Sequence, residues 1–368
     1  MTVHGNDRHR PMNEIPLLFV GPLPPPVHGQ ANSTQYVLNL VRSELARPVR
    51  VINTSERGVI GNAGRMHRLA SHLLAANAII TGQYACAYLS VNARGGLVLT
   101  RLLARLANLR KIPVVFHHHY YWHFAEFDKA VEAMARAAGP SAWHVTNCVD
   151  MSRQMEAIYP AIRRTAAFSN IGAVRVRAID KRGRDKSASP TLGHMSNLSK
   201  AKGIEKLFEA FRSVKAEWSE ARLIVGGPIA DEVAERAVAD AKVEFGNSVE
   251  FLGPLSDADK PGFFERIDVF FNPTTGDTQG IVNLEALASG VPVVATALCC
   301  IPSDIGETGG LVASHEQLTQ SLLEYLDNNK DRLSEAGTKA QKRFDELWDH
   351  HVVEQKHLMA ILDRPENP

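Results

Sequence analysis

The chain has 368 residues, enough for two domains of ordinary size, and its 45% hydrophobic and 22% charged residues are typical of a soluble globular protein. No apolar run reaches the roughly 20 residues that a membrane-spanning helix needs. The net charge of +1 hides an asymmetry, because residues 1–180 carry 20 Lys and Arg against 10 Asp and Glu, whereas residues 181–368 carry 21 against 30. The basic half has no zinc finger and no basic stretch interleaved with aromatic residues, so we expect no nucleic-acid partner. Its charge favours an anionic surface or ligand, or simply attraction between the two halves.

Short apolar runs alternate with helical patterns through the first half. This alternation predicts a doubly wound α/β domain over residues 1–180, and the polar first residues lack the apolar region of a secretion signal, so we expect a cytoplasmic protein. The predicted strands are 15–20, 49–53, 85–91, 113–119 and 143–146, and the predicted helices include 33–43 and 97–109. Residues 175–189 are charged and lose apolar periodicity, which predicts a linker.

The second half repeats the pattern more regularly, over a predicted domain of residues 190–345. Its strands are short and apolar without alternation, which predicts a parallel sheet covered on both faces, with ligands at the carboxyl ends of the strands. We expect strands at 191–195, 221–226, 249–252, 269–272 and 292–295, and helices at 203–215, 231–243, 257–267, 316–327 and 331–362, besides the one that carries Glu285.

The segment 277–285, DTQGIVNLE, is the most informative part of the sequence. It predicts a helix that starts near Gly280 and Ile281, so the free amides of its first turn, including that of Val282, would favour a phosphate. Asp277 stands before this helix end and Glu285 about one turn inside it, so two carboxylates of different depth flank one anion site. That arrangement suits a sugar nucleotide. The alternative is an ordinary amphipathic helix preceded by an acidic loop.

The same motif resembles the glutamate, seven residues, glutamate signature of family 4, the retaining group 1 glycosyltransferases of GT-B fold, whose helix is typically followed by Gly-Val-Pro-Val-Val-Ala as in 290–295. Asp277 stands where the family has its first glutamate. The resemblance implies an α/β fold with two Rossmann-like, doubly wound parallel-sheet domains facing across a cleft, and a last helix, within 346–368, that crosses back to the first domain. It also implies retaining hexosyl transfer from a nucleotide-diphosphate donor, with no metal and no cofactor.

A second contact to the donor diphosphate is implied in the segment 193–208. Where the family has an arginine, four residues and a lysine, this chain has Asn197 and Lys202. Lys202 must then neutralise more of the diphosphate charge, with help from Lys200 or the amides around Gly203. The alternative is that both lysines lie at a solvated helix start. On this resemblance Asp277, Lys202 and His119 are the candidate catalytic residues.

The first domain offers two further segments. In the loop 24–31, PPPVHGQA, Gly29 would let the backbone approach the donor, and His28 is a candidate contact to the sugar or acceptor, although a Pro-rich turn can be purely structural. In the run 116–124, FHHHYYWHF, strand alternation places His117 and His119 on one face. The resemblance implies that His119 contacts the transferred sugar, with His117 a second candidate. Two histidines on one face with no carboxylate nearby do not make a metal site.

The implied partners are a nucleotide-sugar donor and a polyprenyl-diphosphate-linked, lipid-linked or oligosaccharide acceptor, in the assembly of bacterial cell-surface polysaccharide or glycolipid. In 94–111, four arginines, Arg94, Arg101, Arg105 and Arg110, lie among leucines, which predicts a helix with a basic edge beside an apolar face. It would hold the protein peripherally on the anionic inner face of the plasma membrane, unless it packs into the core. The alternative functions are a GT-B sugar-nucleotide epimerase and a catalytically weakened, glycosyltransferase-like nucleotide-binding protein.

Overall fold

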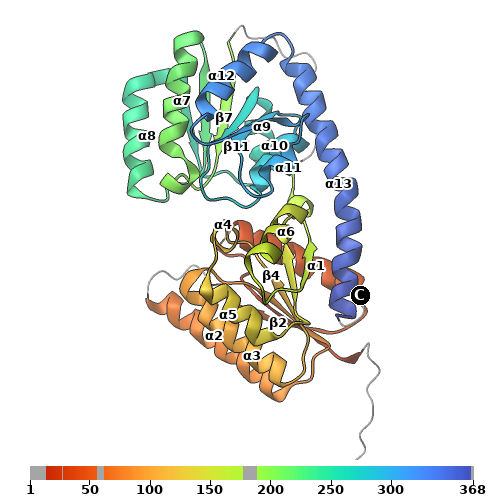
Figure 1. Cartoon of the computed structure of the whole chain (residues 1–368). Helices are drawn as coiled ribbons and strands as arrows, with labels where there is room; N and C mark the ends of the chain where they lie inside the picture. The colour runs from red at the N-terminus through yellow and green to blue at the C-terminus, as the bar shows by residue number, and fades with distance from the viewer. Residues whose placement is uncertain (1–13, 27, 56–61, 177–188, 366–368) are drawn as a thin grey trace, which may run out of the picture. The chain divides into compact units, whose positions relative to one another are not determined.

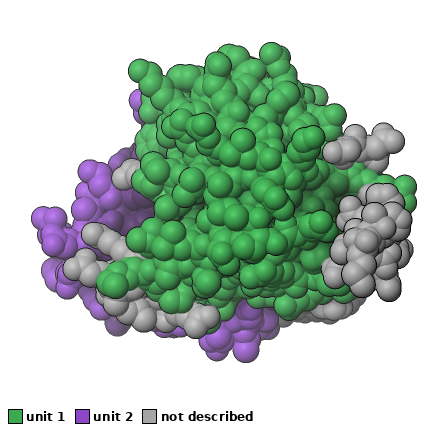
Figure 2. All heavy atoms as spheres, turned by 90° about the horizontal axis from the view of Figure 1, so that it is seen from below, with its two compact units in different colours: residues 1–169, 352–368 green, residues 170–351 purple. Residues whose placement is uncertain are grey.

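The computed structural model describes residues 14–26, 28–55, 62–176 and 189–365 (Figure 1). The chain divides into two compact units: residues 1–169 with 352–368 form unit 1, and residues 170–351 form unit 2 (Figure 2). Most of the predicted linker, 177–188, lies outside the described residues.

Unit 1 is built on a six-stranded parallel sheet in the order β2-β1-β3-β4-β5-β6. Its strands are β1 (Leu17–Gly21), β2 (Val49–Asn53), β3 (Cys86–Ser90), β4 (Val114–His117), β5 (Trp143–Thr146) and β6 (Arg164–Ala167). Its helices are α1 (Gly29–Glu44), α2 (Asn62–Thr81), α3 (Leu97–Leu109), α4 (Trp122–Ala125), α5 (Lys129–Ala138) and α6 (Val149–Ile158). The chain order reverses between β1 and β3, so ligands are expected at the carboxyl ends of these strands.

The two faces of this sheet are covered differently. On one face, α1 and the end of α13 (Leu333–Asp363) pack on the sheet, where Val37, Leu38, Leu358 and Leu362 share a buried cluster with Phe19 of β1. Figure 1 shows α2, α3 and α5 on the other side of the sheet, and α3 packs against both α2 and α5. The helix α13 therefore begins in unit 2 and ends in the core of unit 1.

Unit 2 has a second six-stranded parallel sheet, in the order β12-β11-β10-β7-β8-β9. Its strands are β7 (Thr191–Met195), β8 (Arg222–Gly226), β9 (Val249–Gly253), β10 (Val269–Asn272), β11 (Val293–Thr296) and β12 (Gly310–Ala313). Its helices, besides the first part of α13, are α7 (Ile204–Glu217), α8 (Glu232–Phe245), α9 (Lys260–Glu265), α10 (Ile281–Ala288), α11 (Ile301–Ile305) and α12 (Leu318–Asn329). Separate apolar clusters cover the two faces, one under α7, α8 and α12 and the other under α9, α10, α11 and α13. The order reverses between β7 and β10, whose carboxyl ends lie side by side.

The α/β alternation and the parallel sheets expected from the sequence are confirmed, with most element ends within two residues. Three expectations were wrong in detail. The strand predicted at 113–119 ends at His117, the helix predicted at 257–267 begins only at Lys260, and the helix predicted at 33–43 begins at Gly29. The last difference arises because the His28 side chain caps that helix and so starts it four residues earlier. The sequence pattern placed helices between the strands of the first half without giving bounds for α2 and α5, and it missed α6, β6 and β12.

The helix predicted around the arginines of 94–111 is α3. Its Leu103 is buried, whereas Val98, Leu102 and Leu109 are exposed, so the helix supplies both the core contact and the surface face that the sequence left open. The side chain of Arg94 lies outside the described part of the chain. Among the residues that the structure describes, no helix is long and apolar enough to cross a bilayer.

Candidate functional site

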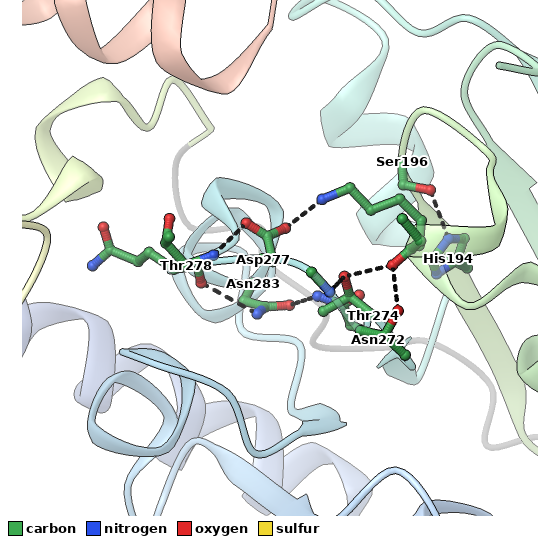
Figure 3. A network of polar contacts seen from close by, with 12 residues as sticks. His194, Ser196, Asn272, Thr274, Asp277, Thr278 and Asn283 are labelled. Atoms are coloured by element: carbon green, nitrogen blue, oxygen red, sulfur yellow. Dashed lines mark hydrogen bonds and ion pairs between the residues drawn. The ribbon is translucent and has the colours of Figure 1, made fainter. Parts of the chain in front are cut away.

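The start of α10 lies just beyond the carboxyl end of β10, at the reversal point of the unit 2 sheet. Gly280 precedes the helix with a φ of +70°, and a Cβ there would lie 2.8 Å from the side-chain nitrogen Nδ2 of Asn283. Asn283 in turn accepts a 2.8 Å hydrogen bond from Asn272 at the end of β10 (Figure 3). This side-chain contact holds the first turn of α10 against the strand, so that the half-exposed Ile281 and Val282 present helix-start amides to the surface.

Lys202 and Asp277, predicted at one anion site, form an ion pair of 2.6 Å between Nζ and Oδ2. The other carboxylate oxygen accepts a 3.0 Å hydrogen bond from the Thr278 backbone N–H (Figure 3). Burial acts to raise the pKa of Asp277, but the Lys202 ammonium and the N–H groups of Thr278 and Gly280 outweigh it, so this pKa is lowered from its ordinary value. Asp277 is thus a carboxylate at neutral pH, held beside a cation.

The loop that carries Lys202 is fixed by its neighbours. Gly203 has a φ of +74°, and a Cβ there would lie 2.0 Å from the carbonyl oxygen of Pro273, so the position accepts only glycine without a backbone shift. The Thr275 N–H donates a 2.9 Å hydrogen bond to the carbonyl of Ala201. The loops after β7 and β10 therefore lie in direct contact, and this contact brings Lys202 to Asp277.

Glu285 is the deeper of the two predicted carboxylates, with a side chain only 2% exposed against 23% for Asp277. Its Oε1 accepts a 2.7 Å hydrogen bond from the ammonium of Lys260, while its Oε2 is buried without a hydrogen-bond partner among the described residues. Burial raises the pKa of Glu285, and Lys260 only partly opposes this effect. The different depths expected from the sequence are confirmed, and one oxygen of Glu285 is left without a partner among the described residues.

Two residues of this region were missed by the sequence pattern. Lys260 is the first residue of α9, where the helix dipole disfavours a cation. This unfavourable position was the only sign in the sequence that Lys260 pairs with a carboxylate, here Glu285. His194, buried at the end of β7, contacts the Phe271 carbonyl through Nδ1 at 2.9 Å and the Ser196 hydroxyl through Nε2 at 2.9 Å (Figure 3). Burial lowers the pKa of His194 to about 4, so its neutral ring orients Ser196.

Asn197 and Lys200 are not brought to the ion pair. Asn197 is exposed in the turn after β7, and no contact recorded for the described residues joins it to Lys202 or Asp277. The backbone N–H of Lys200 donates a 2.9 Å hydrogen bond to the Asp231 carboxylate, at the start of α8. Of the expected cations, the geometry thus places Lys202 alone beside the first carboxylate.

Several histidines of unit 1 lie close together at the carboxyl end of β4. His117 and His119 lie on one side, with ring centroids 4.0 Å apart, and the Tyr88 hydroxyl lies 2.7 Å from His117 Nδ1. His118 points to the other side and pairs with His144 at 3.0 Å, as strand alternation predicts. Burial lowers the pKa of His119 to about 3, with smaller effects of His28 and His123. These rings are neutral at physiological pH, and Nε2 of His119 has no hydrogen-bond partner among the described residues.

The loop prediction for His28 and Gly29 needs correction, because both lie at the start of α1 rather than in the loop before it. His28 is the N-cap residue, and its Nδ1 accepts a 3.3 Å hydrogen bond from the Ala31 N–H. Burial, and then Arg68, lower the pKa of His28. Gly29 is the first residue of the helix, and a Cβ there would meet nothing within 4 Å. Among the described residues, no atom accounts for a glycine at this position.

The arrangement in unit 2 can hold an anion next to a polyol. The amides at the start of α10 and the Lys202 ammonium supply positive charge, whereas Asp277 and the free oxygen of Glu285 accept hydrogen bonds from hydroxyl groups. Among the described residues, no group of three or more His, Cys, Asp or Glu side chains is arranged as metal ligands.

Residues 189–328, most of unit 2, match the family described as "Glycosyl transferases group 1". The alpha-monoglucosyldiacylglycerol synthase of Streptococcus pneumoniae is 31% identical over 153 residues, which are 39% of this chain and 34% of that protein. The phosphatidyl-myo-inositol mannosyltransferase of Mycobacterium leprae is 33% identical over 151 residues, 39% of each chain. The chain thus matches less than two fifths of the length of these relatives.

Solved structures resemble the whole chain at low sequence identity. Sucrose-phosphate synthase from Thermosynechococcus elongatus superposes with a TM-score of 0.71 at 16% identity, over 95% of this chain and 99% of that one. HepE of Anabaena, solved with UDP and glucose, gives a TM-score of 0.65 at 16% identity, over 94% and 98%. The two-domain α/β fold of the GT-B type expected from the sequence is confirmed.

Proposed function

We propose, from the match of residues 189–328 to the group 1 glycosyl transferases, that this chain transfers a hexose from a nucleotide-diphosphate donor to an acceptor hydroxyl. The observation that carries the proposal is the ion pair of Lys202 with Asp277 beside the open first turn of α10. Together with the free oxygen of Glu285, these groups match the three parts of a sugar nucleotide: diphosphate, sugar and ribose.

In this proposal the donor diphosphate lies on the amides of Ile281 and Val282 and takes the Lys202 ammonium as counter-ion. Asp277, released from Lys202 by the incoming phosphate, accepts hydrogen bonds from sugar hydroxyls. Glu285 binds the ribose hydroxyls with Oε2, because Lys260 already occupies Oε1. Three further proposals come from the resemblance. Gly29 faces the donor, His119 contacts the transferred sugar, and His117 or His28 contacts the sugar or the acceptor.

The proposed reaction needs no protein nucleophile. The acceptor oxygen attacks the anomeric carbon from the side on which the diphosphate departs, so that configuration is retained. The bond from the anomeric carbon to the diphosphate oxygen breaks as the new glycosidic bond forms, and the acceptor proton passes to the departing diphosphate oxygen. Negative charge grows on that leaving group, and Lys202 with the α10 amides stabilises it. We propose that neither a metal nor a cofactor takes part, so turnover is expected to survive excess chelator.

The acceptor class remains a proposal supported by the names of the relatives, which are a glucosyldiacylglycerol synthase and a phosphatidylinositol mannosyltransferase. Both names describe lipid-linked products, so we propose a lipid-linked or polyprenyl-diphosphate-linked acceptor, or an oligosaccharide built on one. Such acceptors would be met at the cytoplasmic face of the plasma membrane, in the assembly of glycolipid or surface polysaccharide.

The test is a donor screen with the purified chain, which measures slow hydrolysis of UDP- and GDP-hexoses in the absence of acceptor. We expect hydrolysis of one donor, lost in Glu285→Gln and kept in the control Glu217→Gln, an exposed carboxylate at the end of α7. Nucleoside diphosphate binding without hydrolysis of any donor would indicate the weakened binding protein instead. A donor sugar recovered with inverted C2 configuration would indicate the epimerase.

A further inference from the structure

Gln279 is a fully buried polar side chain in the loop that leads from β10 into α10. Its Oε1 accepts a 2.8 Å hydrogen bond from the backbone N–H of Asn170, and its Nε2 donates a 3.3 Å hydrogen bond to Asp304 Oδ1. A backbone N–H only donates and a carboxylate only accepts, so the two contacts agree on how the amide of Gln279 is oriented. Burial of an amide is unfavourable unless its hydrogen bonds are made, so this side chain fits only where both partners stay in place.

Both partners of Gln279 belong to packed segments of unit 2. Asn170 is buried and begins the short 3-10 helix η3 (Asn170–Ala173). Asp304 is buried in α11, and Arg343 of α13 donates hydrogen bonds of 3.0 and 2.6 Å to two backbone carbonyls of that helix. Gln279 therefore fastens the loop before α10 to two segments that are themselves held.

The neighbours of Gln279 in the chain are the groups that hold Asp277. Thr278 precedes it and Gly280 follows it, and the backbone N–H groups of these two residues both bind the Asp277 carboxylate. A shift of Gln279 would therefore move both donors away from that carboxylate. The first turn of α10 is held separately, by the contact of Asn272 with Asn283.

We propose that Gln279 is a positioning residue of the donor site, whose buried amide fixes the loop 277–280 so that Asp277 is held where it meets the donor sugar. An apolar side chain of similar size would fill the same space, but it would leave the Asn170 N–H and the Asp304 carboxylate without this partner. Only the contact with the sugar rests on the proposed function, because the position of Asp277 can be measured without any substrate.

The test variant is Gln279→Glu, which keeps the side-chain length and the acceptor for Asn170 but turns an oxygen toward the Asp304 carboxylate. Hydrogen–deuterium exchange of the Thr278 and Gly280 amides, measured by mass spectrometry without ligand, should become about tenfold faster or more. Exchange in the last turn of α10 should stay unchanged, because the contact with Asn272 still holds that helix.

The same variant separates turnover from binding. In the donor screen, kcat for hydrolysis should fall about tenfold or more, because Asp277 is displaced from the sugar. Affinity for the nucleoside diphosphate should not fall, because the α10 amides, Lys202 and Glu285 remain. A general loss of packing in unit 2 would instead lower both quantities together.

A reciprocal exchange supplies the rescue. In Gln279→Glu with Asp304→Asn the new amide donates to the new carboxylate, so the contact is restored with the roles reversed and with no change in net charge. This double variant should regain slow exchange of Thr278 and Gly280 and most of the turnover. The matched control is Gln320→Glu on α12, where an exposed glutamine donates a 3.0 Å hydrogen bond to the Glu324 carboxylate, and it should behave like the wild type.

Unchanged exchange of Thr278 and Gly280 in Gln279→Glu would overturn the inference, and so would a double variant as impaired as the single one. A parallel loss of diphosphate affinity and turnover would also overturn it, because Gln279 would then support the whole unit. If Gln279→Glu does not fold, Gln279→Met removes the hydrogen bonds without adding charge and is held to the same expectations. If the wild type hydrolyses no donor, the proposed function fails, whereas the exchange measurements still decide whether Gln279 positions Asp277.

Discussion

Replacement of Lys260 by methionine is the sharpest test of how Glu285 is held. The ammonium lies 2.7 Å from Glu285 Oε1, and the two side chains are only 16% and 2% exposed. Lys260→Met keeps most of the side-chain length and removes the charge, so Glu285 would be left as a buried carboxylate without a counter-ion. The variant therefore isolates the electrostatic role of Lys260 from its packing.

The expected loss in the free energy of unfolding is about 3 kcal/mol near pH 7.5, the lower end of the range for removing one partner of a buried pair. The lower end applies because Lys260 is partly exposed and because Glu285 can escape by binding a proton. Burial already raises the pKa of Glu285, and loss of the ammonium raises it further. A carboxyl whose pKa is raised by folding stabilises the fold below its unfolded pKa, and this stabilisation is lost as pH rises through the folded pKa. The variant should therefore recover stability as pH falls from 7.5 toward 5.

The assay is hydrogen exchange of the α10 amides at several pH values, because it reports the opening of unit 2 without assuming that both units unfold together. The double variant Lys260→Met with Glu285→Gln removes both charges and should regain most of the lost stability. Equal protection in the wild type and Lys260→Met at pH 7.5, or a double variant less stable than the single one, would refute the reasoning.

Three further outcomes follow from the described geometry. In Asp277→Asn, Lys202 loses its ion-pair partner and is free to bind a phosphate. The pair is partly exposed and worth about 0.5–1 kcal/mol, so calorimetry should show a nucleoside diphosphate binding about 2–5-fold tighter. Donor hydrolysis should fall at the same time, and weaker diphosphate binding would contradict this reasoning. Burial in the folded protein lowers the pKa of His144 to about 3. The neutral ring therefore stabilises the fold above pH 6.5, and this stabilisation is lost as pH falls toward 3. The melting temperature should decline less steeply from pH 7 to pH 5 in His144→Gln than in the wild type. Gly29→Ala should leave the melting temperature unchanged, because the added methyl meets no atom of the described residues within 4 Å, yet it should reduce donor turnover if a ligand approaches there. A large fall in melting temperature would show that the glycine is structural.

The helix start at Gly280 was predictable because its determinants are local. A glycine before an apolar helical pattern and carboxylates at fixed spacing all lie within nine residues, and short-range geometry places them. That Lys202 and Asp277 lie at one site was expected only through the resemblance, since the two residues are 75 positions apart, and their ion pair was not expected. The pair of Lys260 with Glu285 depends on how α9 packs against α10, and no local pattern in the sequence encodes that packing.

A helix between the strands at 49–53 and 85–91 was expected, but its bounds and the orientation of α2 were not. Helical periodicity reveals an apolar side of a helix but not which side faces the core. In α2 the inner side consists largely of alanine and serine, whose small size lets the helix approach its neighbours closely. The correct orientation follows only from the packing in the folded unit.

The side chains at the carboxyl ends of β3 and β4 bear on the choice between sugar transfer and epimerisation. A GT-B epimerase needs carboxylates in its first domain to move protons, whereas residues 57–125, which include both strand ends, contain no Asp or Glu. That end of β4 carries His117, His118 and His119, whose pKa values burial lowers far enough to keep them neutral at physiological pH. A buried neutral imidazole donates one hydrogen bond and accepts another, which suits hydroxyl recognition, but its low pKa makes it a poor base for taking a proton from carbon or oxygen. In the proposed transfer the departing diphosphate accepts the proton, so this end of unit 1 needs no base, and its chemistry favours transfer over epimerisation.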